Sequence, residues 1–219
     1  MRWIPWVSPL DQAVEGGNAG LVEYLLAKGA DVKLKTKSGL TALHGAARGG
    51  NQNILLLLLN TPGIDIDANA PNVGTALHLA VIFGNLEPVQ SLVAKGADIN
   101  ATGAGQMTSL NLAAAIGNRT IATFLVNWGA DVNKKAENGS TPLHTAIATG
   151  NTAIAEFLLN KKAEINAKNN DGKTPLGVAT EVLKKIDPAI TPENKTSMEE
   201  LKANLSGLIK LLTDRGATL

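Results

Sequence analysis

Residues 138–170, NGSTPLHTAIATGNTAIAEFLLNKKAEINAKNN, form a stretch that recurs along this chain. Aligning the threonine of T-P-L-H gives separations of 34, 33, 33 and 33 residues between Thr41, Thr75, Thr108, Thr141 and Thr174. Ser8 is a degenerate copy 33 residues before Thr41. Gly-Asn dipeptides and Gly-Ala-Asp triplets keep the same period. Three registers with one period indicate an internal repeat and predict an array of similar units.

Each copy predicts two helices joined by a tight turn. In the quoted copy, Thr141 suits a helix cap and Pro142 suits the first helical turn. Gly150 then permits the left-handed backbone that reverses the chain. The second helix carries apolar residues at the i, i+3, i+4 spacing of one buried face: Ile154, Phe157 and Leu158. Neither helix can bury its face alone, so the copies must stack on one another.

The motifs T-A-L-H at Thr41–His44 and Thr75–His78, T-P-L-H at Thr141–His144 and G-A-D-I-N at Gly96–Asn100 resemble the ankyrin repeat. The resemblance covers the whole chain and implies an all-α ankyrin-repeat solenoid of about six helix-turn-helix units, joined by finger-like turns. It also implies a concave face made by the fingers and first helices. Structural roles are implied for the motif residues, with each imidazole bonding the backbone of a turn: Thr41, His44, Thr75, His78, Thr141 and His144.

The repeats predict one domain over residues 1–219, since no linker interrupts them. Its parts are an N-terminal capping repeat 1–37, internal repeats 38–70, 71–104, 105–137 and 138–170, and an extended C-terminal capping repeat 171–219. Trp3 and Trp6 are expected to cover the exposed N-terminal end. Val73 and Gln106 replace the usual finger glycine, so their fingers are expected to bend differently.

The last repeat departs most from the pattern. A first helix is predicted from Pro175 to about Ile186, followed by a break at the prolines of residues 187–194. A closing helix of roughly twice the usual length is predicted from a capping box of Ser197 and Glu200.

Composition and charge narrow the choice of function. The net charge is +1, 18% of residues are charged and there is no cysteine, which excludes disulfides and thiolate zinc sites and suits a reducing compartment. Two early prolines argue against a secretory signal. The longest apolar run, Ile54–Leu59, is far shorter than the ~20 residues of a membrane helix. We therefore expect a cytoplasmic monomer, or one secreted into a host cell without a classical signal peptide, and no membrane partner.

No catalytic, metal or cofactor site is predicted. The three histidines occupy one repeat position, and Asp31, Asp98 and Asp131 occupy another, so both sets belong to the repeat pattern. With no cysteine and no further histidine, the common nucleophile and base arrangements are missing. We predict that the protein is not an enzyme.

The partner-binding residues are expected where the resemblance places the concave surface. Apolar residues occur there in place of the polar or small ones found in other copies, and basic residues lie beside them: Val73, Ile82, Phe83, Met107, Ile116, Arg48, Lys35 and Lys37. We expect a non-enzymatic scaffold that binds another protein through the middle repeats. The alternative for the apolar residues is that stacking buries them.

Other functions remain open at this stage. Lysines on the fingers could contact nucleic acid or chromatin, although nucleic acid is the less favoured partner. The chain could also be the targeting region of a larger enzyme. Its Asn, Lys and Ile content is compatible with a bacterial effector that is secreted into host cells.

Asn100, Asn133 and Asn166 close Asp/Glu-Ile/Val-Asn triplets that lie eight residues after a leucine. This resembles the pattern that the factor-inhibiting asparaginyl hydroxylase modifies in ankyrin repeats; the alternative is a plain structural asparagine. If the resemblance holds, protein recovered from animal cells should carry one added oxygen on these peptides. Peptide mass spectrometry checks this, and unmodified masses at all three sites would contradict it.

Overall fold

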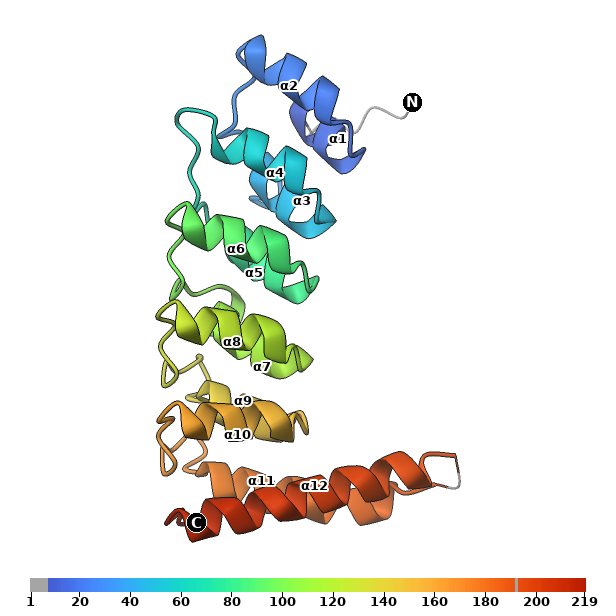
Figure 1. The fold of residues 1–219 in the computed structure, drawn as a ribbon, viewed down its shortest axis with the longest axis vertical. Coiled ribbons are helices and arrows are strands. Elements are labelled where there is room, and N and C mark those ends of the chain that lie inside the picture. Colours follow the sequence, from blue (N-terminus) through green and yellow to red (C-terminus); the bar gives the residue numbers. More distant parts are fainter. Residues whose placement is uncertain (1–7, 192) are drawn as a thin grey trace. The chain divides into compact units, whose positions relative to one another are not determined.

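The computed structural model describes residues 8–191 and 193–219. It contains two compact units, one ending at Ser109 and the other beginning at Leu110. Helices and connecting loops make up both units, as Figure 1 shows. The single domain over residues 1–219 stays a prediction. Trp3 and Trp6 lie outside the described residues.

The first unit contains three helix pairs. In chain order they are α1 (Pro9–Glu15) with α2 (Ala19–Ala27), α3 (Ala42–Gly49) with α4 (Gln52–Leu59), and α5 (Ala76–Ile82) with α6 (Leu86–Ala94). A short 3₁₀ helix, η1, covers Ala104–Gln106. Helix α3 packs between α1 and α5, and α4 packs between α2 and α6. First helices therefore form one layer and second helices another.

The second unit repeats this arrangement. Its helices are α7 (Ser109–Ile116), α8 (Arg119–Asn127), α9 (Pro142–Ala148), α10 (Thr152–Asn160), α11 (Pro175–Ile186) and α12 (Lys195–Asp214), with a 3₁₀ helix, η2, at Asp187–Ala189. Helix α11 packs on α9, and α10 contacts both α8 and α12. The predicted all-α class, with six helix-turn-helix units, is confirmed.

The core is built from the same repeat positions each time. The leucine of T-x-L-H is at most 7% exposed in all six copies, from Leu10 to Leu176. In the second helix of the quoted copy, Ile154 and Leu158 are buried and Phe157 is half-buried, as the periodicity predicts. Burying each such side chain contributes about 1.5–3 kcal/mol, which a single helix pair could not obtain alone.

Two of the Gly-Asn asparagines, Asn85 and Asn151, join neighbouring repeats, a role that was not predicted from the sequence. Asn85 Nδ2 donates to the carbonyl oxygens of Ala47 and Arg48, at 2.8 and 3.0 Å. Asn151 Nδ2 makes the equivalent bonds to Ala114 and Ala115, at 2.8 and 3.1 Å. These carbonyls lie in the last turn of the preceding first helix, where no intrahelical donor remains for them.

The fingers differ where the glycine is missing, as predicted. In three fingers the glycine two residues before the motif threonine is left-handed, for example Gly39 with φ 81°. In the third repeat the positive φ angles move to Asn72 and Gly74, at 62° and 104°. In the fourth they lie at Gly105 and Gln106, within η1. Both altered fingers close with an isolated bridge, at Ala70–Gly74 and Thr102–Thr108.

The C-terminal repeat confirms the length of α11 but corrects the start of α12. The capping box of Ser197 and Glu200 is wrong, because the helix already begins at Lys195 with Asn194 as its N-cap. Asn194 Oδ1 accepts the Thr191 N–H at 2.7 Å and closes the preceding turn. Ser197 lies inside the first turn, where its hydroxyl donates to Asn194 O at 2.9 Å. The 20 residues of α12 confirm a closing helix of about twice the usual length.

Asn151→Ala should lower the free energy of unfolding by about 1–3 kcal/mol, because two carbonyls at the end of α7 lose their donor. Urea denaturation followed by circular dichroism measures this change. Asn204→Ala is the matched control, since Asn204 is exposed on α12 and should leave stability nearly unchanged. Equal stability of the Asn151 variant and wild type would contradict the role of the Gly-Asn asparagine.

Candidate functional site

Each motif histidine bridges its own helix start and the next repeat. His44 Nδ1 lies 3.1 Å from Thr41 N and 2.9 Å from Thr41 Oγ1, while Nε2 lies 3.0 Å from Gly74 O. His78 repeats the pattern with Thr75 and Met107 O, at 3.0 Å. His144 does so with Thr141 and Lys173 O, at 3.1 Å.

This bonding fixes the protonation state of the imidazoles. The backbone N–H can only donate, so Nδ1 must accept; the carbonyl can only accept, so Nε2 must carry the proton. Burial lowers the pKa of His44, His78 and His144 below the ordinary value and favours the same neutral form. Both ring nitrogens are thereby engaged, which leaves neither for a metal ion or for proton transfer.

The first-helix face of the first unit carries an exposed apolar pair. The first-helix face is the surface made by α1, α3 and α5 together with the fingers before α3, α5 and α7. Ile82 and Phe83, at the end of α5, are 41% and 55% exposed, so stacking within the unit does not bury them. Val73 and Met107, on the fingers, are half-buried. The equivalent ends of α1 and α3 carry Glu15-Gly16 and Arg48-Gly49 instead.

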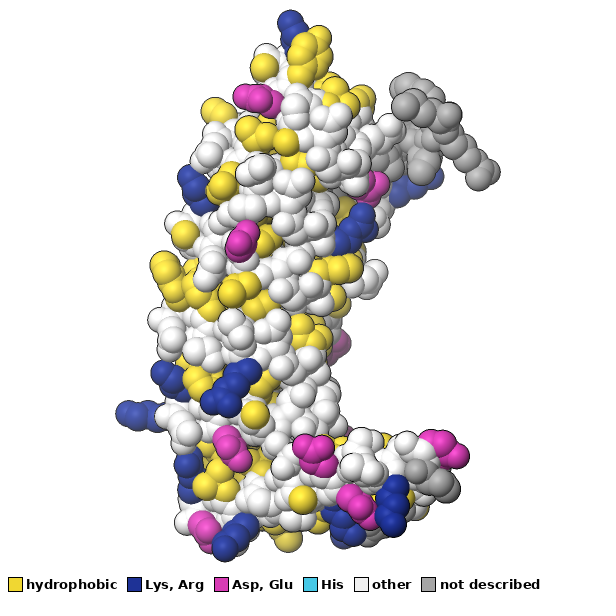
Figure 2. Space-filling model, turned by 45° about the vertical axis from the view of Figure 1, so that its right-hand side comes forward, with side chains coloured by type: hydrophobic (Ala, Val, Ile, Leu, Met, Phe, Trp, Pro, Cys, Tyr) yellow, Lys and Arg dark blue, Asp and Glu magenta, His cyan; other side chains and the backbone are white. Residues whose placement is uncertain are grey.

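The predicted basic residues lie on the same unit. Arg48 Nη2 donates to Glu15 Oε1 at 2.9 Å, which links the ends of α3 and α1. Lys35 and Lys37 are exposed on the finger before α3. Figure 2 shows Lys and Arg side chains interspersed with Asp and Glu on the face that it displays, rather than a field of one sign.

The second unit contributes Ile116, which is 46% exposed at the end of α7. The structure therefore brings Ile82 and Phe83 together on one helix end and places Ile116 in the other unit. Trp128 was not predicted as a candidate; it is 55% exposed after α8 and lies against Phe124, with the ring centroids 5.4 Å apart and the rings tilted by 32°. The sequence does mark Trp128 as unusual, because lysine occupies the equivalent position in three other repeats, at residues 28, 95 and 161.

The three candidate hydroxylation sites lie at the loops that follow the second helices. Asn133 Oδ1 accepts the Glu164 N–H at 2.8 Å, and Asn166 Oδ1 accepts the Thr218 N–H at 2.8 Å. The Asn100 N–H donates to Asp98 Oδ1 at 2.9 Å. The Asn133 and Asn166 amides thus join neighbouring segments, and hydroxylation stays a prediction.

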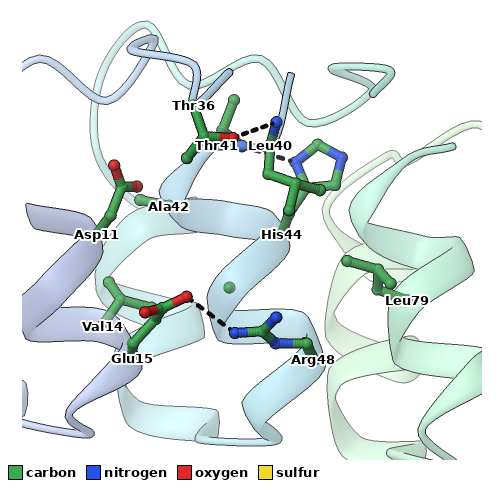
Figure 3. A pocket seen from close by; sticks show the side chains of 11 residues that line it. Asp11, Val14, Glu15, Thr36, Leu40, Thr41, Ala42, His44, Arg48 and Leu79 are labelled. Atoms are coloured by element: carbon green, nitrogen blue, oxygen red, sulfur yellow. Dashed lines mark hydrogen bonds and ion pairs between the residues drawn. The ribbon is translucent and has the colours of Figure 1, made fainter. Parts of the chain in front are cut away.

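A small hollow on the first-helix face of the first unit was also not predicted from the sequence. Gly45 of α3 is among its lining residues. Figure 3 shows Val14 of α1 and Leu79 of α5 on opposite sides of it. Thr36 and Leu40 of the finger close one end, and the Glu15–Arg48 ion pair closes the other. Gly45 is the feature of the sequence that could have indicated the hollow, because the other five repeats carry a side chain at this position.

Residues 8–191 and 193–219 contain neither a cluster of metal-binding side chains nor a helix that could span a membrane. In that part of the chain, no three His, Cys, Asp or Glu side chains gather in a way that could hold a metal ion. Over the same residues, none of the helices combines the length and the apolar character needed to cross a bilayer.

Comparison with known proteins agrees with the repeat pattern. A family model described as ankyrin repeats (3 copies) matches residues 10–103 and 110–186, which is more than half of the chain. The Notch-regulated ankyrin repeat-containing protein of Xenopus tropicalis is 48% identical over 50 residues, 23% of this chain and 44% of that protein. The p105 subunit of rat nuclear factor NF-kappa-B is 38% identical over 96 residues, 43% of this chain and 10% of that protein.

A third relative is the human transient receptor potential cation channel subfamily A member 1, which is 33% identical over 88 residues. That match covers 40% of this chain and 8% of the channel. The chain thus spans less than half the length of each of these relatives.

The stability held by the buried imidazoles should depend on pH. Because folding lowers their pKa below the usual ~6.5, their contribution is complete above pH 6.5 and is lost as the pH falls below it. At pH 7.5, His144→Ala should lower the free energy of unfolding by about 1–3 kcal/mol. At pH 5 the loss should be smaller, because protonation already weakens the wild type. Urea denaturation at both pH values measures this, and an equal loss at both would contradict it.

Proposed function

Since this chain belongs to the ankyrin-repeat family, whose repeats generally mediate protein–protein interactions, we propose that it is a non-catalytic module that binds a partner protein on its first-helix face. The proposal rests most on Ile82 and Phe83, an exposed apolar pair at a helix end where α1 and α3 carry charged residues and glycine. Exposed apolar groups do not stabilise an isolated stack, but they contribute when a partner buries them.

The size of this contribution makes the pair a suitable anchor. Burying an isoleucine or phenylalanine side chain is worth about 1.5–3 kcal/mol, and binding energy tends to concentrate in a few such residues. The half-buried Val73 and Met107 on the fingers extend the apolar character, and Arg48 supplies a charged rim. Ile116 offers an anchor of the same kind on the second unit.

The same observations disfavour nucleic acid as the partner. A protein that binds a phosphate backbone usually presents clustered cations, whereas here Lys and Arg alternate with Asp and Glu (Figure 2) and the net charge is +1. By name, the three relatives are a cation channel, a nuclear-factor subunit and a Notch-regulated ankyrin repeat-containing protein, so they suggest no single partner.

Ile82→Ser with Phe83→Ala should abolish most capture of the partner from cell extract while leaving the melting temperature almost unchanged. The two side chains are already exposed, so truncating them should leave no cavity in the hydrophobic core. Affinity capture with mass spectrometry identifies the partner, and thermal denaturation checks the fold. Weak dependence of capture on salt is expected for an apolar contact, whereas a steep dependence would favour a polyanion.

Trp128→Lys is the matched control, because Trp128 is as exposed as Phe83 but lies after a second helix. Lysine is also the residue of the equivalent repeat positions, so the fold should accept it. This variant should retain the partner. A double variant that still captures the same proteins would contradict the assignment of the first-helix face.

A further inference from the structure

The N-terminal face of the first unit exposes apolar side chains that the other repeats bury. This face is the side of α1 and α2 that is turned away from α3 and α4, at one end of the unit (Figure 1). Leu21 of α2 is 42% exposed, and Leu25, one turn later, is half-buried. The leucine at the position of Leu25 is 0% exposed in each of the next four repeats. The isoleucines at the position of Leu21 are at most 1% exposed: Ile54, Ile121 and Ile154.

The cover that this face lacks is a preceding helix pair. The first repeat packs on its successor as the later repeats do, since α1 contacts α3 and α2 contacts α4. Within the described residues it differs from them in having no pair on its other side, and this difference leaves Leu21 and Leu25 exposed. A terminal repeat that closes a stack needs a polar outer face. The N-terminal face therefore has the residue pattern of a contact between repeats rather than that of a cap.

Asn18, at the start of α2, also matches a link between repeats. Asn85 and Asn151, at the same repeat position, donate from Nδ2 to two carbonyl oxygens at the end of the preceding first helix. Asn18 is exposed, and its Oδ1 accepts the Leu21 N–H at 3.0 Å. No described helix precedes Asn18, so its Nδ2 lacks the carbonyl acceptors that the two later copies use.

Lys28, at the end of α2, repeats the arrangement of Lys161. Each ammonium group lies 5.7 Å from the centroid of an aromatic ring four residues earlier, that of Tyr24 or Phe157. Lys161 Nζ also donates to Asn127 Oδ1, at the end of the preceding second helix, at 3.2 Å. Lys28 is exposed and has the same three donors, so an acceptor at the equivalent point of a preceding helix would complete its contacts.

These groups together specify what the face fits. Leu21 and Leu25 match the apolar side of a second helix, the Asn18 amide matches the unpaired carbonyls at the end of a first helix, and Lys28 matches an acceptor at the end of the second. One surface offers all three features, namely the side of an ankyrin-type helix pair that meets the following repeat. A second copy of this chain does not offer it in its last pair, because the exposed positions of α12 are all polar, charged or small.

We propose that the N-terminal face of the first unit docks the C-terminal side of an ankyrin-type helix pair carried by a partner protein. The contact continues the repeat-to-repeat interface of the unit from one chain into another. Its residues lie on α2 or next to it, outside the first-helix face. The inference therefore goes beyond the proposed function and does not depend on it.

A consensus array of three ankyrin repeats that keeps its N-terminal cap but lacks its C-terminal cap supplies a defined probe. The full chain should bind this array, and the same array with both caps should not bind. Leu21→Glu should raise Kd at least about tenfold, the change expected when one leucine loses its burial. Lys28→Ala should raise Kd about threefold, and this variant serves if the glutamate variant does not fold.

Ile116→Glu is the matched control, because Ile116 is 46% exposed but lies in the second unit, and it should leave Kd unchanged. Ile82→Ser with Phe83→Ala should also leave Kd unchanged, which separates this surface from the one in the proposed function. Fluorescence polarisation measures Kd, and circular dichroism checks the fold of each variant.

Three results would overturn the proposal: no binding, equal binding to the capped and uncapped arrays, or one Kd for wild type, Leu21→Glu and Lys28→Ala. Sedimentation that shows self-association lost with Leu21→Glu would assign the face to a second copy instead. Array binding that appears only after Trp3→Ser and Trp6→Ser would assign it to residues 1–7. Either assignment would also overturn the proposal.

Discussion

A buried imidazole hydrogen-bonded at both nitrogens is the contact on which each stack depends most directly. It ties the first residue of a helix to a carbonyl just before the next repeat, over 29 or 30 residues of sequence. Because one nitrogen must accept and the other must donate, the ring works only when it is neutral. The amides of Asn85 and Asn151 make a second link in the opposite direction along the chain, from a repeat back to the helix end before it. Together these side chains satisfy backbone groups that helix termini would otherwise leave unpaired.

Much of the fold could be predicted from the sequence because the same residue pattern recurs in several repeats, so that an irregular residue in one copy does not hide it. The helix pairs, the left-handed glycines and the buried leucines each follow from a rule that acts within a few residues. The start of α12 could not be predicted in that way, since Asn194 and Ser197 are both suitable N-cap residues and only the folded turn, in which Asn194 Oδ1 accepts the Thr191 N–H, decides between them. The bonds of Asn85 and Asn151 cross from one repeat to another, so no local pattern shows them.

The candidate site was only partly predictable for a related reason. Exposure of Ile82 and Phe83 depends on how neighbouring helices pack, which a repeat register does not specify. The hollow over Gly45 is a property of three helices and a finger at once, although the glycine itself is plain in the alignment of repeats. The positions that vary most freely between copies are the ones that face away from neighbouring repeats, and they carry the residues available for recognition.

Linkage of neighbouring repeats through side chains such as His144 also has a mechanical consequence. In the second unit, tension would load the contacts between repeats in series, because each helix pair is held chiefly by its neighbours. The last pair is held further by the segment after α12, where Thr218 O accepts the Thr174 hydroxyl at 2.6 Å and Arg215 reaches Asn160 Oδ1 at 2.9 Å. Rupture would thus release the chain in steps of one repeat, each about 110 Å of extended backbone, so that a stretched molecule would lengthen in stages and could re-form each junction separately.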